Sequence, residues 1–541
     1  MTKFEVDTVS RRGWYALWAV FLLLLMWPAI LNKGVFLFPD TSTYIRSADG
    51  AVVRLSGYTT HWSEALYRKY PQAVSNSSNE NEKPSPVASA GADQNVLAGR
   101  SIYYGAALYV ADYLGSFWIM AIAQAALVAT ASLLMARRLA GLDAGPNDLL
   151  PILLVPILTS AGFYTAFMMP DLLASLALAA TAMIGLFWQG MPRKERTFWL
   201  AVLILALVSH SANILIVAIV SGCIIVFGRL GKRRLVQMPV LGALALAIIS
   251  EVAFNEAIRF ETGQPPVRPP FLIARLIDDG PGYSYLRDRC PTRPDLVLCR
   301  YLDRLPQPSD TFLWAEGNNG VFSVISPAEQ RLLSSQENEF VLGVIRDHPV
   351  AVVKNSIGRF FNQLSSTGMM EFDGQLFDPQ KLPVQIRSEY LQTGAAQNRI
   401  PVEFFSTTAL LGVLLSGIGL VWIFWAHRKD SHRFRDQSIL FGIVLLGILT
   451  NALVCGAIST PHDRYQTRLL WLVPLIFLSI VKSLVLLPPF MRAQNDPDKS
   501  QHKGKGEPGP NLIAFIAKVI RDSTTHRRSK ILPKTVPGLS L

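Results

Sequence analysis

Four short polar clusters hold most of the residues that could do chemistry in this 541-residue chain. The clusters are Phe38–Tyr44, Met169–Asp171, Ser209–Asn213 and Thr460–Arg468. Each borders a long apolar run. The first two clusters present carboxylates, the third a histidine, and the fourth two arginines with a histidine. A carboxylate in such a place can act as a general base, and arginine matches the oxygens of a phosphate.

Asp40 and Asp171 are the candidate catalytic residues. Partial removal from water at a helix exit is expected to raise the pKa of Asp40 towards the range of a general base. Helix capping is the competing interpretation, because Asp40 precedes Thr-Ser-Thr-Tyr and Asp171 follows a proline at a helix start. Both interpretations stay open for Asp40, and capping is a strong alternative for Asp171.

The elements that position these clusters are expected to be membrane helices. Half of the residues are hydrophobic and 17% are charged, against about 25% charged in a typical soluble protein. The net charge is +12, but Lys and Arg gather in every second link between apolar runs. That alternation is the positive-inside pattern, so the basicity indicates topology and contact with anionic membrane lipids rather than with nucleic acid.

The fold class expected is an all-α polytopic membrane protein with about ten transmembrane helices. The alternation of basic links predicts that both chain ends are cytoplasmic. The location expected is a bacterial inner membrane. The first run lacks a small-residue cleavage site, which indicates a retained helix rather than a signal peptide. The expected helices are about Trp14–Leu31, Ser116–Met135, Leu149–Phe167, Asp171–Trp188, Phe198–Val208, Ala212–Phe227, Val236–Phe254, Val402–Trp425, Ile439–Ala457 and Leu469–Leu487.

The chain divides into four expected parts. Residues 1–254 form an N-terminal membrane core of about seven helices, with a flexible outer excursion near residues 71–99. Residues 255–401 form a periplasmic loop domain, mainly helical or irregular. Residues 402–487 hold the last three helices, and residues 488–541 form a basic cytoplasmic tail. Cys290 and Cys299 are nine residues apart in the outer loop, where an oxidising compartment favours a disulfide.

The candidate substrate-binding residues lie in or beside the outer links. Arg464 and Arg468 at an outer membrane face oppose the positive-inside bias, which favours phosphate binding, with headgroup anchoring as the alternative. A lone histidine such as His210 is more often a structural surface residue. The full set is Tyr44, Arg100, His210, Asn213, His462, Arg464, Tyr465 and Arg468.

Three of these elements together resemble the GT-C superfamily of polytopic glycosyltransferases, which use polyprenyl-phosphate-linked sugars. The elements are Pro39-Asp40-Thr41-Ser42-Thr43-Tyr44, Pro170-Asp171 and His462-Asp463-Arg464-Tyr465. The resemblance covers the membrane core, about Trp14–Trp188, and the last helices. The long Asn255–Pro401 region matches no pattern that we can name.

The resemblance implies an inverting glycosyltransferase of the cell envelope that acts on a lipid, glycan or protein acceptor. Asp40 would remove the proton of the acceptor hydroxyl, and Asp171 would position the acceptor or share that role. Arg464 and Arg468, with His462 or His210, would stabilise the leaving phosphate. No cofactor is required by donors with a monophosphate lipid in many relatives. Relatives with diphosphate donors use a divalent metal, so a metal stays open.

The chain departs from the family in one respect, because many members carry two adjacent acids in the first loop whereas Asp40 has no acidic neighbour before Asp49. Three other classes remain. An arginine-rich loop favours a polysaccharide polymerase or ligase; it contains Arg287, Arg289, Arg293 and Arg300. A transporter or flippase would need polar or broken helices near the midplane, for which the sequence has few candidates. A non-catalytic scaffold is the remaining alternative.

Overall fold

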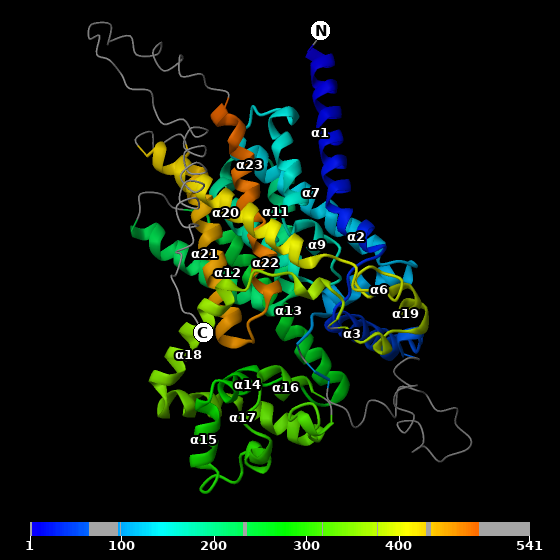
Figure 1. The fold of residues 1–541 in the computed structure, drawn as a ribbon, viewed down its shortest axis with the longest axis vertical. Helices are drawn as coiled ribbons and strands as arrows, with labels where there is room; N and C mark the ends of the chain where they lie inside the picture. Colours follow the sequence, from blue (N-terminus) through cyan, green and yellow to red (C-terminus); the bar gives the residue numbers. More distant parts are fainter. Residues whose placement is uncertain are drawn as a thin grey trace, which may run out of the picture. The chain divides into compact units, whose positions relative to one another are not determined.

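A computed structural model describes residues 3–63, 96–97, 99–230, 235–315, 317–375, 377–428 and 434–485. The fold of these residues is helical, with two isolated β-bridges and no extended strand among them (Figure 1). The predicted all-α class is therefore confirmed for these ranges. The predicted basic tail at residues 488–541, and the predicted flexible excursion near 71–99 except for residues 96, 97 and 99, lie outside the described residues.

Seven of the described helices are long and apolar enough to cross a membrane. The fold of the described residues is therefore that of a multi-pass membrane protein. The seven are α1 with its continuation α2 (Lys3–Leu25, Trp27–Asn32), α7 (Trp118–Ala140), α10 (Asp171–Phe187), α12 (Ser211–Leu230), α13 (Met238–Thr262), α20 (Val402–Ala426) and α21 (Arg435–Ile458).

The predicted total of ten crossings stays a prediction. The helix expected at Phe198–Val208 is the apolar part of α11 (Arg193–Ser209), which begins with charged residues. The last predicted crossing consists of α22 (Asp463–Leu470) and α23 (Leu472–Val485). The helix expected at Val236–Phe254 extends further than predicted. Helix α13 ends at Thr262, where Gly263 forms the C-cap in the left-handed conformation (φ 72°).

The continuous helix predicted at Leu149–Phe167 is wrong, because this predicted crossing is broken into three pieces. They are η2 (Pro146–Leu154), α8 (Val155–Leu158) and α9 (Ala161–Thr165). Pro151 and Pro156 each lack the amide N–H that a continuous α-helix would use, and Thr159 is extended (φ −137°, ψ 175°) and ends α8. Side chains satisfy carbonyls that the breaks set free: Gln124 Nε2 donates to Thr165 O (3.0 Å) and Phe167 O (3.2 Å), and Trp27 Nε1 donates to Pro156 O (2.8 Å).

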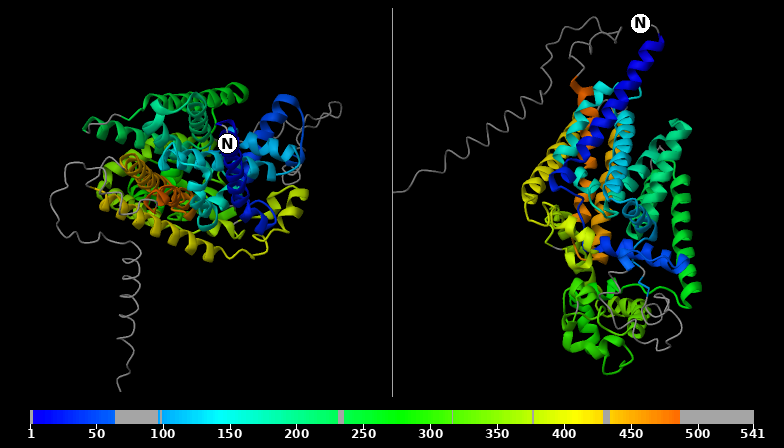
Figure 2. Two further views of the ribbon diagram at one scale, coloured as in Figure 1. Left: turned by 90° about the horizontal axis from the view of Figure 1, so that it is seen from above. Right: turned by 90° about the vertical axis from the view of Figure 1, so that its right-hand side faces the viewer.

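Helix α10 lies at the centre of the bundle. It is apolar on all sides and buried along nearly its whole length, packed against α11, α21 and α22. Helix α13, in contrast, buries few residues and lies at the edge of the bundle (Figure 2, right, green). The first residue of α10 is Asp171, so the N-terminus of the most buried candidate span carries a charged side chain.

Residues 267–347 form a separate small lobe with its own apolar core, which includes Ile273, Leu286 and Phe312. Figure 1 shows its helices grouped at one end of the bundle. The elements are α14 (Phe271–Asp278), α15 (Pro281–Arg289), η4 (Val297–Arg304), α16 (Ser309–Trp314), η5 (Gly317–Asn319) and α17 (Pro327–Asp347). This part of the predicted loop domain is mainly helical, in agreement with the prediction.

The rest of the segment between α13 and α20 joins the membrane core instead. Helix α18 (Pro349–Ser365) packs along α21, and Phe372, Tyr390 and Ile400 belong to the same apolar cluster as the transmembrane helices. The short elements here are η6 (Met370–Phe372), η7 (Pro379–Lys381) and α19 (Val384–Tyr390). This second half of the segment therefore builds the wall of the bundle beside α22.

The small lobe contains a bond between Cys290 and Cys299, whose Cα atoms lie 5.4 Å apart. Cys223 and Cys455 are free. We expect the denatured, unreduced protein to take up alkylating reagent at two cysteines, and the reduced protein at four, as read by intact mass. Alkylation of all four cysteines without reductant would contradict the bond.

Candidate functional site

A short backbone pairing places the first acidic cluster beside the second. Phe36 N donates to Ala166 O (2.9 Å), and Met168 N donates to Phe36 O (3.0 Å). The Thr41 hydroxyl then donates to Met168 O (3.1 Å). Because the broken crossing ends just before Asp171, this pairing brings the start of α3 (Pro39–Ser56) to the start of α10.

The capping interpretation is wrong for both acids. The N-cap of α3 is Phe38, whose amide donates to the Thr41 hydroxyl, while Asp40 lies in the first turn. The N-cap of α10 is Pro170, which receives no side-chain cap. Asp40 and Asp171 thus lie where the helix dipole favours a negative charge, and their carboxylates are free to bind other groups.

Helix α22 carries both arginines of the fourth cluster, and three other parts of the chain hold it. Glu371 accepts a hydrogen bond from Arg464 N (3.1 Å), and Tyr164 donates its hydroxyl proton to Arg464 O (3.0 Å). The Gln363 amide bonds to both the N–H and the C=O of His462. Arg464 and Arg468 are one helical turn apart, so anchoring the backbone of α22 orients both guanidinium groups.

The charged side chains form one continuous chain of contacts. Arg100 Nη2 lies 2.7 Å from Asp40 Oδ1, and Arg464 Nη2 lies 3.8 Å from Asp40 Oδ2. Arg468 Nη1 lies 3.1 Å from Asp171 Oδ1. The ring of Tyr465 lies beside both Arg464 (4.9 Å) and Arg468 (5.2 Å). Six of the sequence-predicted residues are therefore gathered in one cluster, which we name the charge cluster: Asp40, Arg100, Asp171, Arg464, Tyr465 and Arg468.

Arg464 retains unused hydrogen-bonding capacity. Its side chain is only 8% exposed and rests on the ring of Phe38, at 4.2 Å. Nη2 donates to the Tyr465 hydroxyl (3.2 Å), while Nε and Nη1 make no hydrogen bond within the part of the chain that the structure describes. Buried donors normally have a partner, so two such N–H groups on a cation point to an anionic ligand.

The pKa expected for Asp40 is corrected by its surroundings. Burial by itself raises the pKa of this carboxyl, but the guanidinium groups of Arg100 and Arg464 outweigh burial and bring the pKa below its ordinary value. Asp40 is therefore ionised at neutral pH. Desolvation is the only one of these influences that the sequence indicates, because the partner arginines lie 60 residues and more away along the chain.

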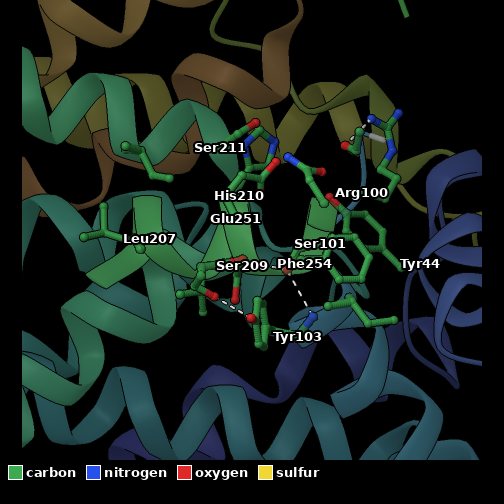
Figure 3. Close-up of a pocket in the computed structure, with 17 residues that line it drawn as sticks. Tyr44, Arg100, Ser101, Tyr103, Leu207, Ser209, His210, Ser211, Glu251 and Phe254 are labelled. Atoms are coloured by element: carbon green, nitrogen blue, oxygen red, sulfur yellow. Dashed lines mark hydrogen bonds between the residues drawn. The ribbon is translucent and has the colours of Figure 1, made fainter. Parts of the chain in front are cut away.

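A small cavity of about 50 Å³ lies beside the charge cluster, at the N-terminus of α6 (Ile102–Tyr113) (Figure 3). Tyr44, Arg100 and His210 line it, together with Tyr103. Burial lowers the pKa of His210 to about 3, so this imidazole is neutral. The other predicted site residues do not line this cavity, whose volume is enough for a few water molecules.

The backbone of α6 touches that of α3 next to this cavity. A Cβ atom on Gly105 would lie 2.3 Å from the Tyr44 carbonyl oxygen, so a side chain here would push the helices apart. The Tyr44 ring packs edge-on to Tyr104 at 5.4 Å. This close packing fixes Arg100, which precedes α6, above Asp40.

Two predicted site residues lie elsewhere. Asn213 is buried and donates to Ala206 O (2.9 Å), so it joins α12 to α11. His462 faces the small lobe, where its Nε2 lies 3.4 Å from Asp310 Oδ2. Helix α16 carries Asp310 and also Trp314, whose ring centroid lies 5.9 Å from the Arg100 guanidinium carbon. The small lobe thus contacts both sides of the charge cluster.

Three residues that were not predicted from the sequence complete the site. Asn451, inside α21, accepts from Arg468 Nη2 (2.9 Å) and donates to Tyr465 O (2.7 Å). A buried amide in an apolar run is itself a signal of function or of helix contacts, so Asn451 was detectable. Glu371 and Gln363 had no such signal, because they lie in a polar segment.

Among the described residues, no group of three or more His, Cys, Asp or Glu side chains is placed to hold a metal ion. Asp40 and Asp171 each bind arginine instead. No protein-family model, curated protein or solved structure matches the chain. The site must therefore be interpreted from its own chemistry.

Proposed function

We propose that the protein is an inverting membrane glycosyltransferase of the GT-C type. It moves a sugar from a polyprenyl-phosphate donor to a lipid, glycan or protein acceptor at the outer face of a bacterial inner membrane. The observation that carries this proposal is Arg464, a buried cation with two unused N–H groups beside an ionised carboxylate. A phosphate and a nucleophilic hydroxyl are the two groups that such a pair would bind.

In this mechanism Arg464 and Arg100 bind the donor phosphate, and Asp40 accepts the proton of the acceptor hydroxyl. The hydroxyl oxygen attacks the anomeric carbon while the bond to the phosphate oxygen breaks, and the guanidinium groups stabilise the charge on the leaving phosphate. A phosphate that draws Arg100 and Arg464 away from Asp40 leaves burial as the main influence on that carboxyl. The pKa of Asp40 then rises, and Asp40 becomes a stronger base on donor binding.

The basic residues of the helix ends support the orientation in this proposal. The ends away from the charge cluster carry Arg137 and Arg138 on α7, and Arg193 and Lys194 on α11. Under the positive-inside rule these ends face the cytoplasm. The charge cluster and the disulfide-bonded small lobe then face the other side, where a disulfide persists.

The geometry supports neither the polymerase or ligase class nor the transporter class. The arginines of the predicted basic loop are exposed and paired with carboxylates of the small lobe, for example Arg289 with Asp347 at 2.7 Å and Arg300 with Glu329 at 2.8 Å. They form no gathered site for a polymerase or ligase. The broken crossing is the kind of feature that transporters use, but Phe163, Tyr164 and Thr165 within it are fully packed.

The test is direct transfer by the purified full-length protein in lipid vesicles. The donors are radiolabelled sugars linked to polyprenyl monophosphate and, separately, to polyprenyl diphosphate, with an envelope lipid and glycan extract as acceptor. We expect release of lipid phosphate and label on an acceptor with the monophosphate donors. Turnover with the diphosphate series only, or with no sugar of either series, would contradict the proposal as stated.

The pH dependence of transfer tests the role of Arg100. Removing a cation that lowers the pKa of Asp40 leaves burial less opposed, so Arg100→Gln raises that pKa. Asp40 must be ionised to accept a proton, and kcat/KM reports the enzyme before the donor draws Arg100 away. The acidic limb of the pH profile of kcat/KM is therefore expected to move to higher pH. Arg100→Lys keeps the charge and shifts the limb less. Arg287→Gln, an exposed arginine of the small lobe, serves as the matched control; an equal shift in it would exclude this explanation.

A further inference from the structure

Helix α18 has its polar and apolar faces reversed relative to a helix of a soluble protein. Its inward face is polar: Asn355 donates to Asp279 O (2.9 Å), and Arg359 Nη2 lies 2.8 Å from Asp279 Oδ1. Gln363, two turns after Asn355 on the same face, bonds to His462. These residues recur every four positions and so form one stripe.

The opposite face of α18 is apolar and uncovered. Val350, Val353, Ile357 and Phe361 are 79%, 59%, 53% and 60% exposed, and their spacing of three, four and four residues places them on a single stripe. This stripe lies about 180° from the Asn355–Gln363 stripe at 100° per residue. Water would solvate such a helix poorly, because four large apolar side chains face it together.

The position of α18 indicates what covers the stripe. A Cβ atom on Gly456, near the end of α21, would lie 2.7 Å from the Arg359 carbonyl oxygen, so the two backbones touch. Helix α21 is one of the candidate membrane spans, and its own exposed residues include Leu445, Leu449 and Leu453. The polar face of α18 therefore packs on the end of α21, and the apolar stripe points away from it, at the end of a candidate membrane span that exposes leucines of its own.

We infer that α18 lies in the membrane boundary, with its apolar stripe in the acyl chains and its polar face towards the protein. Lys354 is exposed beside the stripe, and its long side chain reaches the phosphate layer while its methylenes stay in the apolar zone. The helix thereby fixes the small lobe, which α17 connects to it, at the membrane surface above the charge cluster. This inference does not depend on the proposed enzymatic activity.

Spin-label accessibility in the full-length protein, reconstituted in phosphatidylcholine–phosphatidylglycerol vesicles, tests it. Single cysteines carry a nitroxide in a background with Cys223→Ala and Cys455→Ala and with the Cys290–Cys299 bond intact. The test positions are Val353→Cys, Ile357→Cys and Phe361→Cys. Leu453→Cys on α21 is the lipid reference, and Asn338→Cys on the exposed side of α17 is the water reference.

Collision with oxygen reports hydrocarbon, and collision with a water-soluble nickel chelate reports water. We expect the three α18 positions to follow Leu453, with high oxygen and low nickel accessibility, and Phe361 to be at least as deep as Val353 because α18 runs from the small lobe towards α21. High nickel accessibility, as at Asn338, would overturn the inference. Low accessibility to both reagents would also overturn it, because a protein surface and not lipid would then cover the stripe.

Discussion

Asp40→Asn is expected to reduce sugar transfer by about 10²–10⁴-fold while the protein still inserts and folds. The amide keeps the size of the side chain and some of its hydrogen bonds to Arg100, but it cannot accept the proton of an acceptor hydroxyl. The measurement is the initial rate of transfer from a polyprenyl-phosphate sugar in vesicles, at saturating donor. Binding of the donor is expected to change less than the rate, since the phosphate contacts come from arginine.

Two further variants make the result specific. Asp40→Glu retains a carboxylate and is expected to keep more activity than Asp40→Asn. Asp288→Asn removes an exposed carboxylate of the small lobe and should leave the rate unchanged. Because Arg100 and Arg464 lose their negative partner in Asp40→Asn, thermal unfolding is measured in parallel. A full rate in the folded Asp40→Asn protein would remove Asp40 from the chemistry.

The buried pair of Arg468 and Asp171 is expected to give the largest change in stability. Their side chains are 1% and 3% exposed, and Arg468 also binds Asn451. Removing one partner leaves an uncompensated charge in the protein interior, at a cost of about 3–5 kcal/mol for a buried pair. Arg468→Met and Asp171→Leu are each expected to lower the unfolding temperature in detergent strongly.

The double variant separates the pair from its surroundings. Arg468→Met with Asp171→Leu leaves neither charge unpaired, so it is expected to recover most of the stability that either single change loses. If the stability lost in the double variant equals the sum of the losses in the two single variants, the two side chains act independently. Exposed controls, Arg289→Met and Asp347→Leu, should show small changes, because exposed ion pairs contribute about 0–1 kcal/mol. Recovered stability without recovered transfer would assign the charges a role in the site.

The membrane character of the fold was predictable because it depends on local composition. An apolar run of sufficient length forms a helix in a bilayer whatever its neighbours are, and seven such helices are present among the described residues. The broken crossing was not predicted, although Pro151 and Pro156 signal it. Its composition is as apolar as that of a continuous membrane helix. Side chains that donate to its freed carbonyls, Gln124 and Trp27 among them, stabilise the irregular backbone there.

The site was predictable in part. Polar clusters at helix ends identified the acids and the arginines of the charge cluster, and Arg100 was selected beside them. Which acid pairs with which arginine could not be predicted from the sequence. Asp40 contacts Arg100 and Arg464, and Asp171 contacts Arg468, across separations of 60 to more than 400 residues. Glu371 and Gln363 were not predicted for the same reason, since their role in the site comes from their hydrogen bonds to the start of α22.

The amino-acid order alone determined that this chain crosses a membrane, which helix ends carry its charges, and which residue types are available for phosphate and proton chemistry. These properties follow from the free energy of transferring each segment into lipid, which is a sum over neighbouring residues. Tertiary structure alone decided which charges meet, and thus that Asp40 has a lowered rather than a raised pKa. The physical reason is that a side chain's electrostatic environment is set by distance in space, and helix packing brings together groups from opposite ends of the sequence.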